Sequence, residues 1–170
     1  LTNLFYRDLK DIRNKNQENH IGNKCLISNN AIIKGGCVIG NNVTIKDGSI
    51  INRNCKIGNN CIIEENCVIS NAIIGENVRI GRNSSIGQPG FGFSINNYKN
   101  IPIYHVGRVI LQSNVNIGCN CCIDRGSFND TTIGENTFID NMSHIAHNVR
   151  IGSNCIFAAM VGIAGSTVIG

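Results

Sequence analysis

The stretch IGNNVTIKDGSIINRNCKIGNNCIIEENCVI, residues 39–69, places an aliphatic residue at every sixth position. This period fits neither an α-helix, which returns apolar residues after three and four positions, nor a long strand, which alternates. Hexapeptide repeats are typical of β-helices, where a short strand and a turn form one side of each coil. We therefore predict an all-β fold, a parallel β-helix shaped as a triangular prism, with three hexads to a coil of eighteen residues.

The same period covers most of the chain. The aliphatic series begins at Ile21, restarts at Ile74 and at Leu111, and runs again from Ile133 to Ile169, giving twenty-two hexads in four blocks. The aliphatic residue opens each hexad and should point inward, stacked on its equivalents in neighbouring coils. Gly, Asn and Asp near the corners should supply the turn conformations.

The fifth hexad position carries a second, smaller side chain that should also point inward. Seven of the nine cysteines occupy it: Cys25, Cys37, Cys55, Cys61, Cys67, Cys121 and Cys155. We interpret them as small buried apolar residues. A disulfide between Cys37 and Cys55, one coil apart, is the alternative.

The repeat divides the chain. Residues 1–20 lack it, and their apolar spacing predicts a short amphipathic helix to about residue 13, followed by a linker. Residues 21–170 should form one β-helix domain with an extended loop at 88–110. The chain stops in mid-hexad, which we interpret as the mark of a fragment of a longer protein.

The net charge of +4, without a dense basic block, gives little support for a nucleic-acid partner, and no apolar stretch is long enough to span a bilayer.

The segment IDNMSHIAHNVRIG, residues 139–152, carries the best candidates for chemistry. His147 is the third residue of its hexad and should point outward, and Gly165 lies eighteen residues later, one coil away. Histidine can act as a general base, and a glycine N–H can meet an oxyanion without a side chain in the way. This pair suits acyl transfer. Asp140 should be outward and polar, and His144 should lie near a corner; each of these residues could also be ordinary surface.

Four segments resemble the UDP-3-O-acylglucosamine N-acyltransferases of lipid A biosynthesis: IGQPGFGF (86–93), IPIYHVGRVIL (101–111), IGCNCCIDRGSFNDTTIGENTFIDNMSHIAHNVRIG (117–152) and VGIAGSTVIG (161–170). The resemblance implies a left-handed prism. It also implies transfer of a (3-hydroxy)acyl chain from acyl carrier protein to the 2-amino group of UDP-3-O-acylglucosamine. In it, His147 is the catalytic base, the Gly165 N–H stabilises the intermediate, and Asp140 and Asn141 contact the sugar.

The same resemblance implies further properties. The enzyme would be a homotrimer in the bacterial cytoplasm, with active sites between neighbouring prisms and with no cofactor and no metal. His144, Phe91 and Phe93 are further candidates for the substrate site. Pro89 departs from the family pattern G-x-D-G-F-G. The family's N-terminal uridine-recognising domain and C-terminal helical region have no counterpart in this sequence.

Three other functions fit the repeat. The nearest is another hexapeptide acyltransferase, either a UDP-sugar O-acyltransferase or an N-acetyltransferase. A γ-type carbonic anhydrase would use His105, His144 and His147 as zinc ligands, although their spacing does not match that family. The last is a structural β-helix without catalysis.

Overall fold

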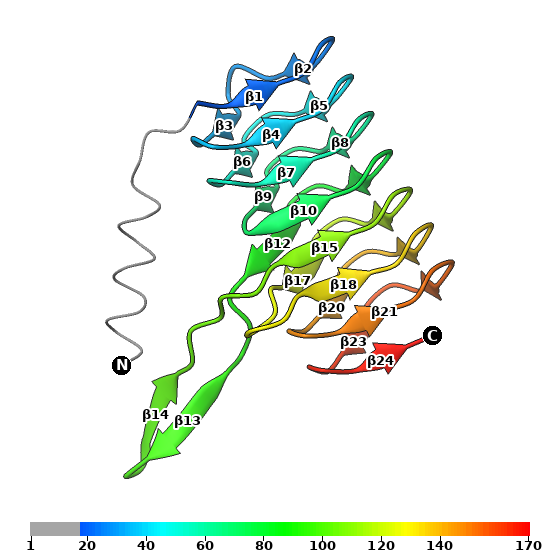
Figure 1. Ribbon diagram of the computed structural model, residues 1–170. Helices are drawn as coiled ribbons and strands as arrows, with labels where there is room; N and C mark the ends of the chain where they lie inside the picture. Colours follow the sequence, from blue (N-terminus) through cyan, green and yellow to red (C-terminus); the bar gives the residue numbers. More distant parts are fainter. Residues whose placement is uncertain (1–17) are drawn as a thin grey trace.

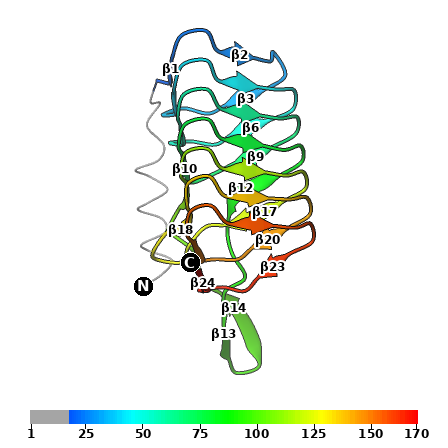
Figure 2. The same ribbon diagram turned by 90° about the vertical axis from the view of Figure 1, so that its right-hand side faces the viewer.

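The computed structural model describes residues 18–170, which wind into a triangular prism (Figures 1 and 2). Each coil contributes one short strand to each of three parallel sheets, so strands adjacent in a sheet are three elements apart in the chain, or five where a two-stranded hairpin intervenes. The predicted left-handed parallel β-helix is confirmed. The helix expected before residue 13, and most of its linker, lie outside the described residues.

The three sheets, here called A, B and C, run the length of the prism. Sheet A holds β1 (His20–Ile21), β4 (Val38–Ile39), β7 (Lys56–Ile57), β10 (Ala72–Ile74), β15 (Val109–Leu111), β18 (Thr131–Ile133), β21 (Arg150–Ile151) and β24 (Val168–Ile169). Sheet B holds β2 (Leu26–Ile27), β5 (Thr44–Ile45), β8 (Ile62–Ile63), β11 (Arg79–Ile80), β16 (Asn116–Ile117), β19 (Phe138–Ile139) and β22 (Ile156–Phe157). Sheet C holds β3 (Ile32–Ile33), β6 (Ile50–Ile51), β9 (Val68–Ile69), β12 (Ser85–Gln88), β17 (Cys122–Asp124), β20 (His144–Ile145) and β23 (Gly162–Ile163).

The core consists of the two hexad positions that were predicted to face inward. The aliphatic first positions, such as Ile63 and Ile123, are fully buried and stack from coil to coil. The fifth positions fill the space beside them with small side chains. All nine cysteines are free thiols, so the alternative of a disulfide is wrong. Burial raises the pKa of Cys55, Cys61 and Cys67 to about 11, which keeps these thiols neutral.

Asparagine dominates the fourth hexad position because the backbone there adopts a left-handed conformation. Asn42, Asn60 and Asn77 have φ near 57°, a region that asparagine tolerates better than most residues. Their side chains also form a ladder along the corner between sheets A and B. Each amide donates to the Oδ1 of the next asparagine at 3.1 Å. The asparagine-rich composition therefore follows from the turns.

Glycine at the second hexad position has a different cause from the one expected. Gly58 and Gly81 do not have positive φ, so the turn does not require them. A Cβ atom on Gly58 would lie 2.5 Å from the Gly75 carbonyl oxygen, and one on Gly81 would lie 2.6 Å from the Gly118 carbonyl carbon. Glycine is needed here because successive coils approach closely at the corners.

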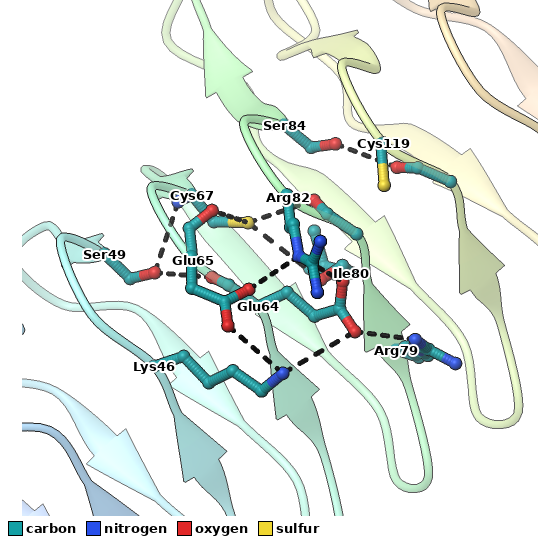
Figure 3. A network of polar contacts seen from close by, with 12 residues as sticks. Lys46, Ser49, Glu64, Glu65, Cys67, Arg79, Ile80, Arg82, Ser84 and Cys119 are labelled. Carbon is teal, nitrogen blue, oxygen red and sulfur yellow. Dashed lines mark hydrogen bonds and ion pairs between the residues drawn. The ribbon is translucent and has the colours of Figure 1, made fainter.

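A network of charged side chains holds the corner between sheets B and C (Figure 3). The buried carboxylate of Glu64 lies 2.6 Å from Arg79 Nη2 and 3.7 Å from Arg82 Nε. Glu65 lies 2.9 Å from Arg82 Nε and 3.4 Å from Lys46 Nζ. These residues come from successive coils, so the network joins neighbouring coils on the outside of the prism.

One segment leaves the prism after β12. It forms an antiparallel hairpin of β13 (Phe93–Asn96) and β14 (Lys99–Pro102), which projects clear of the coils (Figures 1 and 2). The chain rejoins sheet A at β15. The register between β12 and β17 shifts where Gln88 pairs with Asp124, so the departure begins with a bulge.

Two adjacent isoleucines of β8 should differ sharply in how much each contributes to the free energy of unfolding. Ile63 is fully buried, whereas the side chain of Ile62 points outward and the residue is 39% exposed. We expect Ile63→Ala to lower the free energy of unfolding by about 2–5 kcal/mol. Ile62→Ala should change it by less than about 1 kcal/mol. Chemical denaturation of both variants measures this difference, and equal losses would contradict the inward register.

Candidate active site

His147 lies in the turn between β20 and β21, at the corner where sheet C meets sheet A. Its carbonyl oxygen accepts a hydrogen bond from the Ser166 N–H at 2.9 Å, which sets the neighbouring coil directly alongside. A Cβ atom on Gly165 would lie 2.8 Å from both Nε2 and Cε1 of His147. The imidazole therefore lies against the bare backbone of Gly165. Among the backbone hydrogen bonds of residues 18–170, none uses the Gly165 N–H as donor.

Asn148 orients the His147 ring. Its Oδ1 lies 3.0 Å from His147 Nδ1 and also accepts the Ser127 N–H at 3.1 Å. Since an amide oxygen only accepts, Nδ1 carries the proton and Nε2 keeps its lone pair. Asn148 is itself fixed, because its N–H donates to Thr131 Oγ1 at 2.8 Å. The nitrogen that faces Gly165 is thus the basic one.

His105 lies in the segment that returns from the hairpin to sheet A, and it packs against His147. It is only 5% exposed, and its ring centroid lies 5.2 Å from that of His147. The Gly90 N–H donates to His105 Nδ1 at 2.7 Å. Burial, and then the neighbouring His147, lower the pKa of His105. A Cβ on Gly90 would lie 2.8 Å from His147 Cβ, so glycine lets the loop pass close to both histidines.

A buried carboxylate completes this corner. Asp124 ends β17 and is 4% exposed; its Oδ1 accepts a hydrogen bond from Gln88 Nε2 at 2.7 Å, and its Oδ2 lies 3.5 Å from His144 Nε2. Burial raises the pKa of Asp124, an effect that His144 opposes. His144 was expected near a corner, and it is the first residue of the two-residue strand β20. The sixth hexad position immediately precedes the inward aliphatic residue of the strand.

The structure separates the residues expected to hold the sugar from His147. Asp140 and Asn141 follow β19 at the corner between sheets B and C. His147 lies at the opposite edge of sheet C, at its corner with sheet A. Both Asn141 N–H and Nδ2 donate to Asp140 Oδ1, at 2.7 and 2.6 Å. Together they line a groove of about 420 Å³ with Phe138 and Ile156. Within one chain, the two sets of residues do not form one site.

Phe91 and Phe93 lie where the chain leaves the prism for the hairpin. Their rings meet edge to face with centroids 5.1 Å apart, and the residues are 84% and 41% exposed. The two exposed aromatic rings flank Gly92, where an added Cβ would lie 2.7 Å from His105 Nε2. They offer an apolar surface that residues 18–170 leave uncovered. Pro89, the departure from the family pattern, is exposed.

The histidines do not form a metal centre. Within residues 18–170, no three His, Cys, Asp or Glu side chains are grouped so that they could hold a metal ion. His105 accepts from the loop backbone, His144 faces Asp124, and His147 faces Asn148. This arrangement does not favour a carbonic anhydrase.

Sequence reasoning missed three members of this corner. Asp124 lies within a motif of the resemblance but carries no predicted role, and Asn148 carries none either. His105 is predicted only as a possible zinc ligand. Asp124 could have been found, since it follows an inward isoleucine where glycine is common. The approach of His105 depends on the path of an irregular loop, which the repeat does not specify.

Comparison with known proteins agrees with the hexapeptide β-helix fold described above. The bacterial transferase hexapeptide model (six repeats) matches residues 130–165, and the GMPPB C-terminal domain model matches residues 20–96. A UDP-3-O-acylglucosamine N-acyltransferase of Caulobacter vibrioides is 53% identical over 92 residues, which are 54% of this chain and 27% of that protein. The matched part therefore spans about a quarter of that relative.

Two solved structures share the fold. AntD, an N-acyltransferase from Bacillus cereus, superposes with a TM-score of 0.66 at 24% identity, over 90% of this chain and 83% of its own. The UDP-N-acetylglucosamine acyltransferase from Campylobacter jejuni gives a TM-score of 0.66 at 27% identity, over 84% of this chain and 56% of its own. The comparisons thus confirm that this hexapeptide β-helix resembles the UDP-3-O-acylglucosamine N-acyltransferases, over about half of its length.

Proposed function

We propose that the protein is an N-acyltransferase of lipid A biosynthesis, which moves a (3-hydroxy)acyl chain from acyl carrier protein to the 2-amino group of UDP-3-O-acylglucosamine. The observation that carries the proposal is the His147 ring lying against Gly165, in a chain that is 53% identical over 92 residues to an enzyme of that name. Since the match covers about a quarter of that enzyme, the chain is proposed to be one part of a longer protein.

His147 is suited to act as the general base. The amine nitrogen attacks the thioester carbonyl, forming a C–N bond, while Nε2 of His147 accepts the amine proton. The negative charge that develops on the carbonyl oxygen is stabilised by the Gly165 N–H. When the tetrahedral intermediate collapses, the C–S bond breaks and His147 returns the proton to the departing thiolate. Asn148 keeps the ring in the required tautomer throughout.

The separation of Asp140 and Asn141 from His147 supports a homotrimer. A sugar that contacts these residues and His147 together must lie between two chains, since the residues occupy different corners of one prism. A threefold ring would set the corner between sheets B and C of one chain beside the corner between sheets C and A of the next. Phe91 and Phe93 would then face the surface of the neighbouring chain, and His144 would lie at the margin of the shared site.

The proposed location is the bacterial cytoplasm, where the nucleotide sugar and acyl carrier protein would meet the enzyme. In the part of the chain that the structure describes, no helix has the length and apolar character needed to cross a membrane. No cofactor is required by the proposed chemistry.

Incubation of the purified protein with acyl carrier protein loaded with a 3-hydroxyacyl chain, and with UDP-3-O-acylglucosamine, tests the function. Mass spectrometry should show an amide on the 2-nitrogen and release of the carrier thiol. UDP-N-acetylglucosamine, which has no free amine, is the matched control acceptor. Acylation of its 3-hydroxyl instead would replace the proposal with a UDP-sugar O-acyltransferase, the second candidate.

The role of Asn148 gives a prediction of its own. Its backbone has φ of 61°, so we choose Asn148→Gly, which removes the amide and keeps the conformation accessible. The loss of the acceptor for His147 Nδ1 should lower kcat by about 10–100-fold, with little change in KM. Steady-state kinetics measures this split. Asn154→Gly, at the same φ of 61° in another turn, should leave kcat unchanged, and equal losses in both variants would indicate only a structural role.

A further inference from the structure

A basic groove runs along the corner that also carries His147. It encloses about 450 Å³ at the corner between sheets C and A, and it is lined by residues from before and after the hairpin. Five of its twelve lining residues are cationic and none is acidic: Lys34, Arg53, Lys56, Arg108 and Arg125. The chain has fifteen Lys and Arg residues in all, so one third of its cations meet in this groove. Such a gathering indicates an anionic ligand.

The cations differ in how they are held. Arg125 is 6% exposed and donates from Nε to the Gly107 carbonyl oxygen at 2.6 Å, so its guanidinium is fixed at the base of the groove. Arg108 is neutralised by Asp130, 2.8 Å from its Nη2. Lys34 and Lys56 have no carboxylate within ion-pair distance in residues 18–170 and are exposed. The groove therefore combines a rigid arginine with flexible lysines.

The polar groups that line the groove suit oxygen-rich ligands. Asn52 belongs to one coil and Ser70 and Asn71 to the next, and Asn52 Nδ2 donates to Ser70 Oγ at 2.6 Å. The apolar lining residues are Ala72, Ile73 and Val106, so the groove presents both polar and apolar side chains to a ligand. Arginine offers bidentate donors to phosphate oxygens, while lysine acts as a point charge.

The groove leads to the proposed catalytic centre. Arg125 follows Asp124, and Val106 follows His105, whose ring lies beside His147. In sheet C, β17 is one strand from β20, and β3, which ends just before Lys34, is five strands from it. At about 4.8 Å for each strand, the groove extends from about 5 Å to about 24 Å from the coil of His147. A substrate anchored here could place its reacting atom at His147.

We propose that this groove binds the phosphate group of a substrate of the acyl transfer, an inference that rests on the proposed function. Two sources have this chemistry. One is the diphosphate of the nucleotide sugar, which would sit close to the reacting amine. The other is the phosphodiester of the phosphopantetheine arm, whose thioester lies at the far end of a long chain.

Binding of simple probes to the intact protein tests the inference without acyl transfer. The variant is Lys34→Gln combined with Lys56→Gln, both at exposed positions. Lys24→Gln, an exposed lysine in the turn between β1 and β2 at another corner, is the matched control. Calorimetry with UDP, with uridine and with 4′-phosphopantetheine is performed on wild type and on both variants at low and at physiological salt.

We expect the double variant to bind one phosphate probe at least fivefold more weakly, while Lys24→Gln binds like wild type. Weaker binding of UDP with uridine unaffected identifies the nucleotide, and weaker binding of phosphopantetheine identifies the donor arm. The difference between wild type and variant should shrink as salt screens the charges. Unchanged affinity for both probes, or no binding of either by wild type, overturns the inference. If acyl transfer is still observed in that case, the proposed function survives and only the groove assignment fails.

Discussion

The His147→Ala variant should lose acyl transfer almost completely, with a fall in kcat of about 10²–10⁴-fold. The imidazole is the only general base that the structure places against Gly165, within the described residues, and its Nε2 is the free nitrogen. Without it, the attacking amine must lose its proton to water. A single-turnover assay with the acyl carrier protein substrate measures the chemical step directly.

Folding must be separated from chemistry in this experiment. His147 is half-buried at a corner and is not part of the apolar core, so the melting temperature of the variant should stay close to that of wild type. His20→Ala, at an exposed position in β1, is the control for loss of a histidine and should be fully active. A His147→Ala variant with normal activity would leave the structural β-helix as the better description of the protein.

The second large effect on acyl transfer is expected when one methyl group is added at Gly165. A Cβ on Gly165 would lie 2.8 Å from His147 Nε2 and Cε1, closer than van der Waals contact permits. Gly165 does not have positive φ, so alanine fits its backbone and only the imidazole has to move. We expect Gly165→Ala to lower kcat by about 100-fold or more, since a shift of about 1 Å is enough to do so.

Gly162 provides a matched control for this change. It lies three residues earlier, in β23, and a Cβ there would meet nothing within 4 Å. Gly162→Ala should therefore keep both activity and stability. Kinetics and thermal melting of the two variants, measured in parallel, distinguish a local clash from general intolerance of this coil to side chains. Equal activity of the two variants would remove Gly165 from the proposed mechanism.

The fold could be predicted from the sequence because a repeat constrains every coil in the same way. Ile63 and its equivalents had to be inward once the period was six, and the cysteines of the fifth position had to share that interior. The reason for glycine at the second position was missed. It depends on the distance between coils, which becomes visible only when Gly58 is seen beside Gly75.

The candidate site was only partly predictable. The stacking of His147 on Gly165 follows from counting eighteen residues, and the structure places them so. The pairing of His144 with Asp124 joins adjacent coils across an irregular insertion, where counting fails. His105 reaches His147 through the returning loop, and the distance between Asp140 and His147 depends on which corner each occupies. Tertiary geometry, not residue type, decided these cases.

Because the coils stack at a constant spacing, the number of coils sets the distance between features along one corner. The basic groove and His147 belong to the same corner but to different coils. Duplication or loss of eighteen residues between them would change their separation by about 4.8 Å and would leave every side chain facing as before. A protein built in this way can adjust the length of the molecule it accepts in fixed steps, without redesigning its core or its catalytic groups.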